Sequence, residues 1–368
     1  MWMLREIRRR GGEVGFRDFM ELALYHPEHG YYAARPAPWG RGGDYLTAPT
    51  ASGWYGATLA HFLGQLAERA GSPLRLVDVA AGDGSFLAAV LEGLGGRAAA
   101  VLVGVTAVDR VAVMRDRAAR RLAGAAVPVV VAASPPANDG SPTVVHASEL
   151  YDAFPVHRVR QGRDGLEELA VAVDGGALEW RARPAGPELA AYLQSHGVVL
   201  DPGQLAEIGL ATGPYHGALL ESVGQGLALV LDYGYEAVRL YDPRGRRHGS
   251  LVSYSGHRLD RELLDRPGER DLTAHVNWDD LRQAAARCGW RELALLSLAE
   301  LLVRAGLGVV AEARGLGMAA ELDAATVAAR QELKRLLDPE GMGSDLKMLI
   351  QGRGPLADAA AELLGREP

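Results

Sequence analysis

Five short apolar runs, separated by segments with helical spacing, constrain the fold of this chain more than any other feature. A continuous apolar run of this length is typical of a strand that is buried on both faces. Strands that alternate with helices predict βαβ units and a mostly parallel sheet. We therefore expect an α/β fold with a Rossmann-like sheet. The runs cover residues 74–80, 100–109, 127–133, 143–148 and 227–234.

Two further apolar runs, at 291–297 and 346–352, could close this sheet at one edge as an antiparallel pair. Five mostly parallel strands and two closing strands make the sheet of a class I methyltransferase-like Rossmann variant. The expected helices after the fifth run cover residues 278–288, 297–305 and 320–337.

A β-rich insertion of about 156–225 separates the fourth run from the fifth. Its alternating segments surround the turns QGRDG and DGG, which predicts antiparallel strands. Helices are expected after them at 187–195 and 203–211. A second irregular stretch covers residues 235–275.

The first 70 residues contain two expected helices, at 15–26 and 52–69, with a Gly- and Pro-rich loop between them. We therefore expect a helical N-terminal cap over residues 1–70 and a catalytic domain over residues 71–368. The insertions at 156–225 and 235–275 would lie on the substrate side of that domain.

Composition excludes several classes of protein. Among the 368 residues, 39 Lys and Arg oppose 46 Asp and Glu, for a net charge of -7, so no nucleic-acid partner is expected. The sequence has no apolar stretch of about 20 residues, so no membrane span is expected. The basic N-terminus is not followed by the apolar segment of a secretory signal, so no such signal is expected. The single cysteine, Cys288, excludes an intramolecular disulfide and fits the cytoplasm. His26 and His29 have no indicated third ligand, so no metal site is expected.

The segment from Val77 to Leu87 contains the most informative local pattern. An apolar strand enters a turn of small residues, and a helix follows. Such a turn lets a ligand approach the backbone and the free N–H groups of the helix start. Asp83 stands between Gly82 and Gly84, where it would repel a pyrophosphate and suit a cofactor with a cationic amino-acid end, such as S-adenosylmethionine. The alternative is a tight strand-to-helix turn with no ligand.

Two other strand ends have acidic residues. Asp109 follows the second run, where Rossmann-type sites place an acid that accepts both ribose hydroxyls; it could also cap a helix at 110–123. Glu149 and Asp152 follow the fourth run, at the carboxyl end of a central strand, where a carboxylate could hold a cationic or protic nucleophile. Asp152 could equally cap a short turn before Pro155.

The chain resembles the MidA-type methyltransferases, relatives of a mitochondrial complex I assembly factor that methylates arginine in a protein subunit. The matching segments are in the family's order and extend over nearly the whole chain. They lie at residues 16–27, 30–32, 43–49, 148–156, 231–235, 249–257, 267–276 and 341–349.

This resemblance implies a class I S-adenosylmethionine-dependent methyltransferase that acts on an ω-nitrogen of arginine in a protein. The implied catalytic residues are Glu149, Asp152 and His275. The implied cofactor-binding residues are Asp44, Thr47, Asp78, Ala80, Gly82, Asp83, Gly84, Asp109 and Ser148. The loop from Asp44 to Thr47 would fold over the cofactor.

The chain departs from the family pattern at three positions. Ala80 replaces a glycine, Ser148 an asparagine and Thr50 an acid. These changes leave open a small-molecule or peptide natural-product acceptor, methylated on oxygen or nitrogen, and a catalytically silent assembly factor. A nicotinamide oxidoreductase is a third alternative, against which the missing third glycine and Asp83 argue. The apolar C-terminal helices could pack on the core, the default expectation, or on a second copy in a homodimer.

Overall fold

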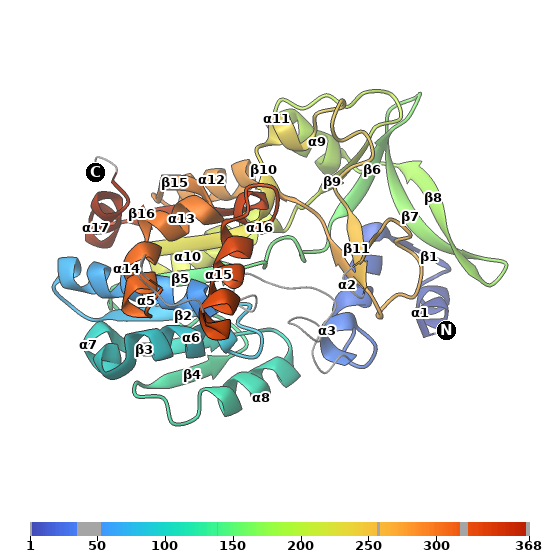
Figure 1. Ribbon diagram of the computed structural model, residues 1–368. Helices are drawn as coiled ribbons and strands as arrows, with labels where there is room; N and C mark the ends of the chain where they lie inside the picture. The colour runs from blue at the N-terminus through green and yellow to red at the C-terminus, as the bar shows by residue number, and fades with distance from the viewer. Residues whose placement is uncertain (1, 35–52, 138, 256–257, 317–322, 366–368) are drawn as a thin grey trace. The chain divides into compact units, whose positions relative to one another are not determined.

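The computed structural model describes residues 2–34, 53–137, 139–255, 258–316 and 323–365 (Figure 1). Asp44, Thr47 and Thr50 lie outside these residues. The chain forms two compact units, each made of segments that are distant in sequence. The sheet unit consists of residues 46–150, 217–233 and 285–368. The insertion unit consists of residues 1–45, 151–216 and 234–284.

The sheet unit is built on the predicted Rossmann-like sheet, with strand order β15-β16-β10-β5-β2-β3-β4. The strands from β10 to β4 pair in parallel, and the five apolar runs provide them. Parallel strands end at one edge of a sheet, so the residues that follow β2, β3 and β5 lie on the same edge. These strands are β2 (Leu74–Val79), β3 (Leu102–Val108), β4 (Val129–Ala132), β5 (Thr143–Ser148) and β10 (Gly226–Tyr235).

The expected closing pair is confirmed. β16 (Leu346–Arg353) runs antiparallel to β10, and β15 (Arg291–Ser297) runs antiparallel to β16. The last strand in sequence therefore inserts between β10 and β15.

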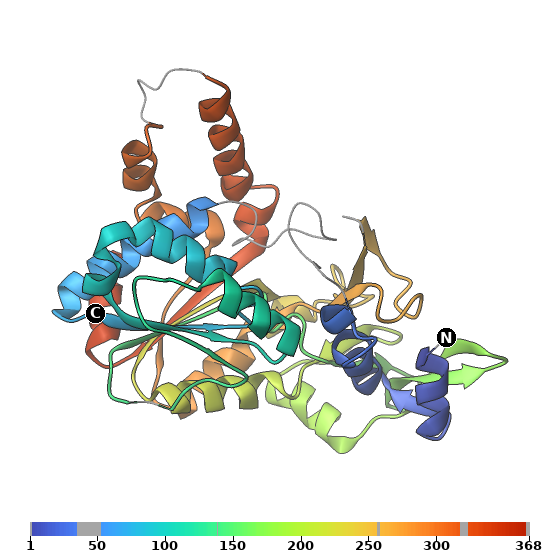
Figure 2. The ribbon, with the colours of Figure 1, turned by 90° about the horizontal axis from the view of Figure 1, so that it is seen from below.

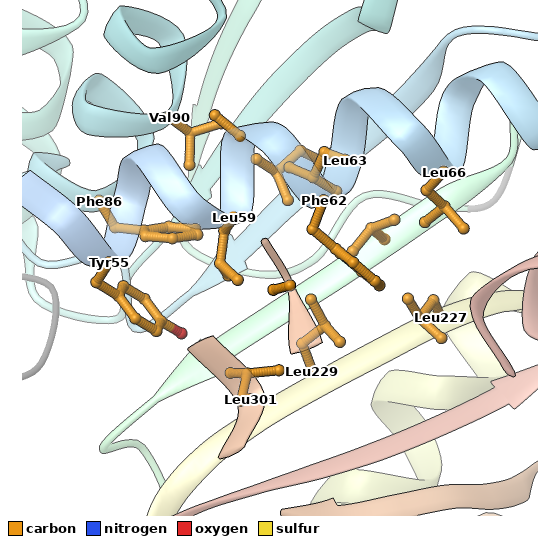
Figure 3. Close-up of a cluster of buried hydrophobic side chains, with 14 of the residues drawn as sticks. Tyr55, Leu59, Phe62, Leu63, Leu66, Phe86, Val90, Leu227, Leu229 and Leu301 are labelled. Carbon is orange, nitrogen blue, oxygen red and sulfur yellow. The ribbon is translucent and has the colours of Figure 1, made fainter. Parts of the chain in front are cut away.

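Helix α5 (Gly53–Ala70) provides much of the core of the sheet unit. Twelve of its 18 residues are buried, because the sheet, α6, α14 and α17 surround it. Figure 3 shows its side chains between those of α6 and β10, with Tyr55 near Phe86. Helix α10 lies on the opposite face of the sheet (Figure 2). The other helices here are α6 (Ser85–Leu94), α7 (Ala98–Val101), α8 (Ala112–Arg121), α10 (Thr212–Val223), α13 (Leu298–Arg304), α14 (Leu307–Ala313), α15 (Ala324–Leu337), α16 (Met342–Asp345) and α17 (Pro355–Leu363).

The insertion unit contains the predicted antiparallel strands, and the N-terminal segment joins them. Strand β7 pairs with β8 and β6, and also with β1. β9 pairs with β6 in the same sheet, while β11, β12 and β13 form a separate three-stranded sheet. The strands are β1 (Glu13–Gly15), β6 (His157–Gln161), β7 (Leu166–Asp174), β8 (Ala177–Pro184), β9 (Leu205–Ile208), β11 (Val252–Ser255), β12 (Arg258–Asp260), β13 (Asp271–Thr273) and β14 (Val276–Asn277).

Short helices complete this unit. Helix α2 buries Phe16, Phe19 and Met20 in a core that includes Val171 of β7. The expected helices at 187–195 and 278–288 are confirmed as α9 and α12. The helices are α1 (Trp2–Arg9), α2 (Phe16–Tyr25), α3 (Tyr31–Ala34), α9 (Pro187–Ser195), α11 (Ala237–Leu240) and α12 (Trp278–Arg287).

The helix expected at 203–211 is wrong. Residues Leu205–Ile208 form β9, and the next helix begins at Thr212. The pairing with β6 joins His157 to Ile208, and Leu205 also forms a bridge with His248. Tertiary strand pairing therefore overrides the local helical spacing.

The domain boundary expected at residue 70 also differs from the division of the structure. The compact units divide between residues 45 and 46, and α5 belongs to the sheet unit, because its apolar faces pack in the sheet core. The described residues 2–34 belong with the β-rich insertion and do not form a separate helical cap.

Candidate functional site

The turn between β2 and α6 has a left-handed backbone at three positions. The φ angles are 60° at Ala80, 53° at Gly82 and 79° at Gly84. Glycine adopts this region without strain, whereas alanine does so at a cost of about 1–2 kcal/mol. Ala80 therefore keeps the conformation that the family's glycine would favour. At Gly84, a Cβ atom would lie 3.2 Å from the Ala118 Cα of α8, so the helices also require glycine there.

The side chain of Asp83 stabilises this turn. Its Oδ1 accepts a hydrogen bond from Ser85 N at 3.1 Å, and its Oδ2 pairs with Arg121 Nη2 at 2.5 Å. Arg121 Nε also donates to the Asp83 carbonyl at 3.0 Å. The carboxylate that was expected to face a cationic cofactor end is thus already compensated by a guanidinium.

Asp109 connects the ends of β2 and β3. Its Oδ2 accepts from Gly82 N at 3.0 Å, and its Oδ1 accepts from Val111 N at 2.8 Å, just before α8. Burial raises the pKa of Asp109 to about 6, although these two backbone hydrogen bonds act in the opposite direction. A carboxylate has about four acceptor positions, so the group retains capacity for ribose hydroxyls.

Glu149 follows β5 with a φ of 50°, a conformation that is strained for a residue with a side chain. Its N–H donates to the Leu231 carbonyl of β10 at 2.8 Å, which fixes this backbone against the neighbouring strand. Beside it, the Ser148 Oγ atom is buried and has no hydrogen-bond partner among the described residues. A buried hydroxyl without a described partner, next to a residue whose backbone is strained, indicates a position for a ligand.

Asp78 has a different environment from the one expected of a cofactor-binding residue. It is buried within β2, and its Oδ1 lies 2.7 Å from His146 Nδ1 on β5. His146 Nε2 lies 2.8 Å from the Tyr55 hydroxyl of α5. Burial raises the pKa of Asp78 and that of Tyr55. The bonds are satisfied together when Tyr55 donates to Nε2 and Nδ1–H donates to Asp78.

The other two catalytic candidates lie in the insertion unit. The Asp152 carbonyl accepts from Ala274 N at 2.9 Å, so Asp152 and His275 belong to neighbouring backbone segments. His275 Nδ1 accepts from Arg246 Nη1 at 2.8 Å. Burial, with the Arg246 charge as the second cause, lowers the pKa of His275 to about 4. A neutral imidazole with this pKa is a weak base at neutral pH, so His275 is suited to donate a hydrogen bond from Nε2.

The residues of the sheet unit fit S-adenosylmethionine. The left-handed turn leads into α6, Asp109 follows the adjacent strand, and Ser148 Oγ has no hydrogen-bond partner among the described residues. The sequence reasoning missed His146 and Tyr55. A histidine inside an otherwise apolar strand was the available signal, because a buried histidine needs hydrogen-bond partners.

The comparisons with known proteins agree with this arrangement. Residues 56–295 match the model of a family described as "Putative S-adenosyl-L-methionine-dependent methyltransferase". The chain belongs to this family. The enzyme is thus an S-adenosylmethionine-dependent methyltransferase, which argues against the nicotinamide oxidoreductase and the silent assembly factor.

A solved structure is similar to this methyltransferase over nearly its whole length. It is described as a "likely methyl transferase from Burkholderia thailandensis bound to S-adenosyl-homocysteine". The sequence identity is 28% and the TM-score 0.83, with 97% of this chain and 93% of that chain covered.

Curated relatives carry the name protein arginine methyltransferase NDUFAF7, mitochondrial. The Xenopus tropicalis protein is 25% identical over 75% of this methyltransferase and 69% of its own length. The Drosophila melanogaster homolog is 25% identical over 94% of this chain and 83% of its own length.

Two other kinds of feature are absent from the described part of the methyltransferase. It contains no helix that is long and apolar enough to cross a bilayer. Within the same residues, no three His, Cys, Asp or Glu side chains are grouped as a metal site would require.

Proposed function

We propose that this methyltransferase transfers a methyl group to an ω-nitrogen of an arginine in a protein. The observation that carries the proposal is the Glu149 carboxylate at the end of β5, on a strained backbone with a φ of 50° that is bonded to Leu231. A carboxylate is the natural partner of a guanidinium, which it can bind through two parallel hydrogen bonds. The names of the curated relatives support the same acceptor.

The cofactor would supply an electrophilic methyl group on a sulfonium. The left-handed turn from Ala80 to Gly84 would let it approach the backbone closely, and Asp109 would accept the ribose hydroxyls. Glu149 would accept hydrogen bonds from the guanidinium and orient the reacting nitrogen in line with the methyl group. The same carboxylate would receive the proton that this nitrogen loses.

The test is a Glu149→Gln variant assayed with labelled S-adenosylmethionine and arginine-containing proteins or peptides. We expect kcat to fall by about a hundredfold or more, the usual range for the loss of a positioned base. Affinity for S-adenosylhomocysteine should change by less than about threefold, because Asp109 and the turn are unaltered. Glu92→Gln, an exposed position on α6, is the matched control. Normal turnover by Glu149→Gln would contradict the role of Glu149.

Hydrolysis of the labelled product identifies the acceptor. Methylarginine in the hydrolysate would support the proposal. Label in a small molecule or in a peptide natural product, with none in methylarginine, would replace it with the alternative acceptor. The cytoplasmic location and the homodimer stay predictions, which fractionation and sedimentation would test.

A further inference from the structure

Two guanidinium groups of the insertion unit lie against one aromatic ring. The Cζ atom of Arg246 is 4.1 Å from the centre of the Tyr235 ring, and that of Arg239 is 4.9 Å from it. Tyr235 is the last residue of β10, and Arg239 belongs to α11. Each arginine gains a cation–π contact, but two like charges at one ring repel each other.

His275 holds Arg246 in this position. Its Nδ1 accepts from Arg246 Nη1 at 2.8 Å, and its ring centre is 5.4 Å from that of Tyr235. The backbone N–H of His275 donates to Ser250 Oγ at 3.1 Å, which anchors the backbone of His275. Because Nδ1 is an acceptor, the neutral ring carries its proton on Nε2. The cluster of Tyr235, Arg239, Arg246 and His275 thus provides N–H donors on three side chains.

In the part of the chain that the structure describes, no carboxylate pairs with the two arginines of this cluster, Arg239 and Arg246. The acidic residues that are close in sequence bind elsewhere: Glu236 and Asp279 pair with Arg282, and Asp242 Oδ1 accepts from Arg244 N. Two uncompensated guanidinium groups in a chain with a net charge of -7 favour an external anion.

We infer that this cluster binds a carboxylate of the protein acceptor, from an aspartate or glutamate side chain. The inference rests on the proposed function in one respect, that the acceptor is a protein. The planar guanidinium of Arg246 matches a carboxylate, and its cation–π contact and its bond to His275 hold that plane. Arg239, which is exposed, adds a second positive charge.

Three peptides separate the binding of the carboxylate from the methylation. The first is acetyl-(Asp-Gly)3-Arg-(Gly-Asp)3-amide, which places acids at several distances from one arginine. In the second, Asn replaces every Asp; in the third, Gln replaces only the Arg. Calorimetry on the full chain with S-adenosylhomocysteine at low ionic strength should give an affinity for the first peptide about tenfold above that for the second. This preference should shrink in 0.5 M salt, because screening weakens exposed charge pairs.

Variants then show which residues cause the preference for the acidic peptide. Arg246→Gln should reduce the ratio of the two affinities to near one, and Arg239→Gln should reduce it by about half or more. Arg246→Lys keeps the positive charge but lacks the planar, paired N–H donors of a guanidinium, so it should retain part of the affinity ratio. Arg244→Gln, an exposed position in the same loop, is the control and should retain all of it. Loss of the Arg246 charge should also raise the pKa of His275, which NMR measures and which shows that Arg246→Gln is folded.

Failure of this inference differs from failure of the proposed function. Equal affinities for the first two peptides, or a preference that survives in both Arg246→Gln and Arg239→Gln, would overturn the carboxylate site. A preference for acidic peptides that includes the Gln peptide, without methylation of any arginine peptide, would support the site and contradict arginine as the acceptor.

Discussion

Asp78 and His146 are register partners on the parallel strands β2 and β5, and a 2.7 Å hydrogen bond joins their side chains inside the core. Both side chains are almost fully buried. The Phe86 ring stacks on His146 with centres 3.8 Å apart. The strands that this pair connects lead to Ala80 and Glu149, the two non-glycine residues of the sheet unit with a left-handed backbone among those described. We therefore expect the pair to fix the strand ends that carry the candidate site.

Asp78→Asn should lower the free energy of unfolding by about 2–4 kcal/mol, because the change disturbs a buried, hydrogen-bonded pair. Tyr55→Phe removes only the outer donor and should cost about 1 kcal/mol. Urea denaturation measures both effects, and the double variant shows their coupling. If each single variant changed the free energy of unfolding by less than about 0.5 kcal/mol, this chain of hydrogen bonds would not contribute to stability.

Affinity for the cofactor should fall as the pH decreases below about 6. Burial raises the pKa of Asp109 to about 6 in the ligand-free protein. Ribose hydroxyls donate to the ionised carboxylate, so protonation competes with binding, and the loss approaches tenfold per pH unit. Calorimetry with S-adenosylhomocysteine between pH 5 and 8 checks this. The Asp109→Asn variant should bind S-adenosylhomocysteine weakly, with an affinity that does not change over this pH range. The Asp116→Asn variant, changed on α8, should show the same pH dependence as the parent protein.

Ala80→Gly should stabilise the protein by about 0.5–1 kcal/mol. The left-handed backbone at Ala80 costs about 1–2 kcal/mol, and the added freedom of glycine in the unfolded chain offsets part of the gain. Removal of the methyl group should also leave cofactor affinity unchanged or increased. Thermal unfolding with and without S-adenosylhomocysteine measures both effects. A lower melting temperature would show that the turn relaxes around the alanine side chain.

Stability should decrease as the pH rises above about 6.5, in part because of His196. His196 Nε2 lies 3.0 Å from Asp280 Oδ1, and this partner is the main cause that raises the pKa of His196. A raised folded-state pKa means that the charged form of His196 stabilises the folded protein. This stabilisation is complete below the unfolded-state pKa and is lost as the pH rises through the folded-state pKa. Denaturation at pH 5.5 and 8.5 should show this decrease, and His196→Gln should reduce it. His248→Gln, at an exposed position, should not alter the slope.

Gly268→Ala should be strongly destabilising, by more than about 2 kcal/mol. The φ angle of Gly268 is 87°, and a Cβ atom there would lie 2.1 Å from the His29 carbonyl oxygen. The N-terminal segment and the segment before β13 therefore need glycine at their contact. Gly245→Ala, where the nearest atom would be 3.7 Å away, is the matched control. Equal melting temperatures of the two variants would contradict this close contact.

Continuous apolar runs made the central sheet predictable, because strands buried on both faces require them. The same local reasoning failed at 203–211, where β6 captures Leu205–Ile208 as a strand. It also separated α5 from the sheet that buries it, and it did not join β1 to β7. These features depend on partners that are far away in the sequence.

The sequence by itself determined the strand-turn-helix pattern at 77–87, the acids Asp109 and Glu149 after their strands, and the order of the family segments. These are local, because a strand end and the residue after it are neighbours in the chain. Only the tertiary structure decided which groups meet: Asp83 with Arg121, Asp78 with His146, and Arg246 with His275. Burial raises the pKa of Asp78 and lowers that of His275, and burial is a property of packed neighbours.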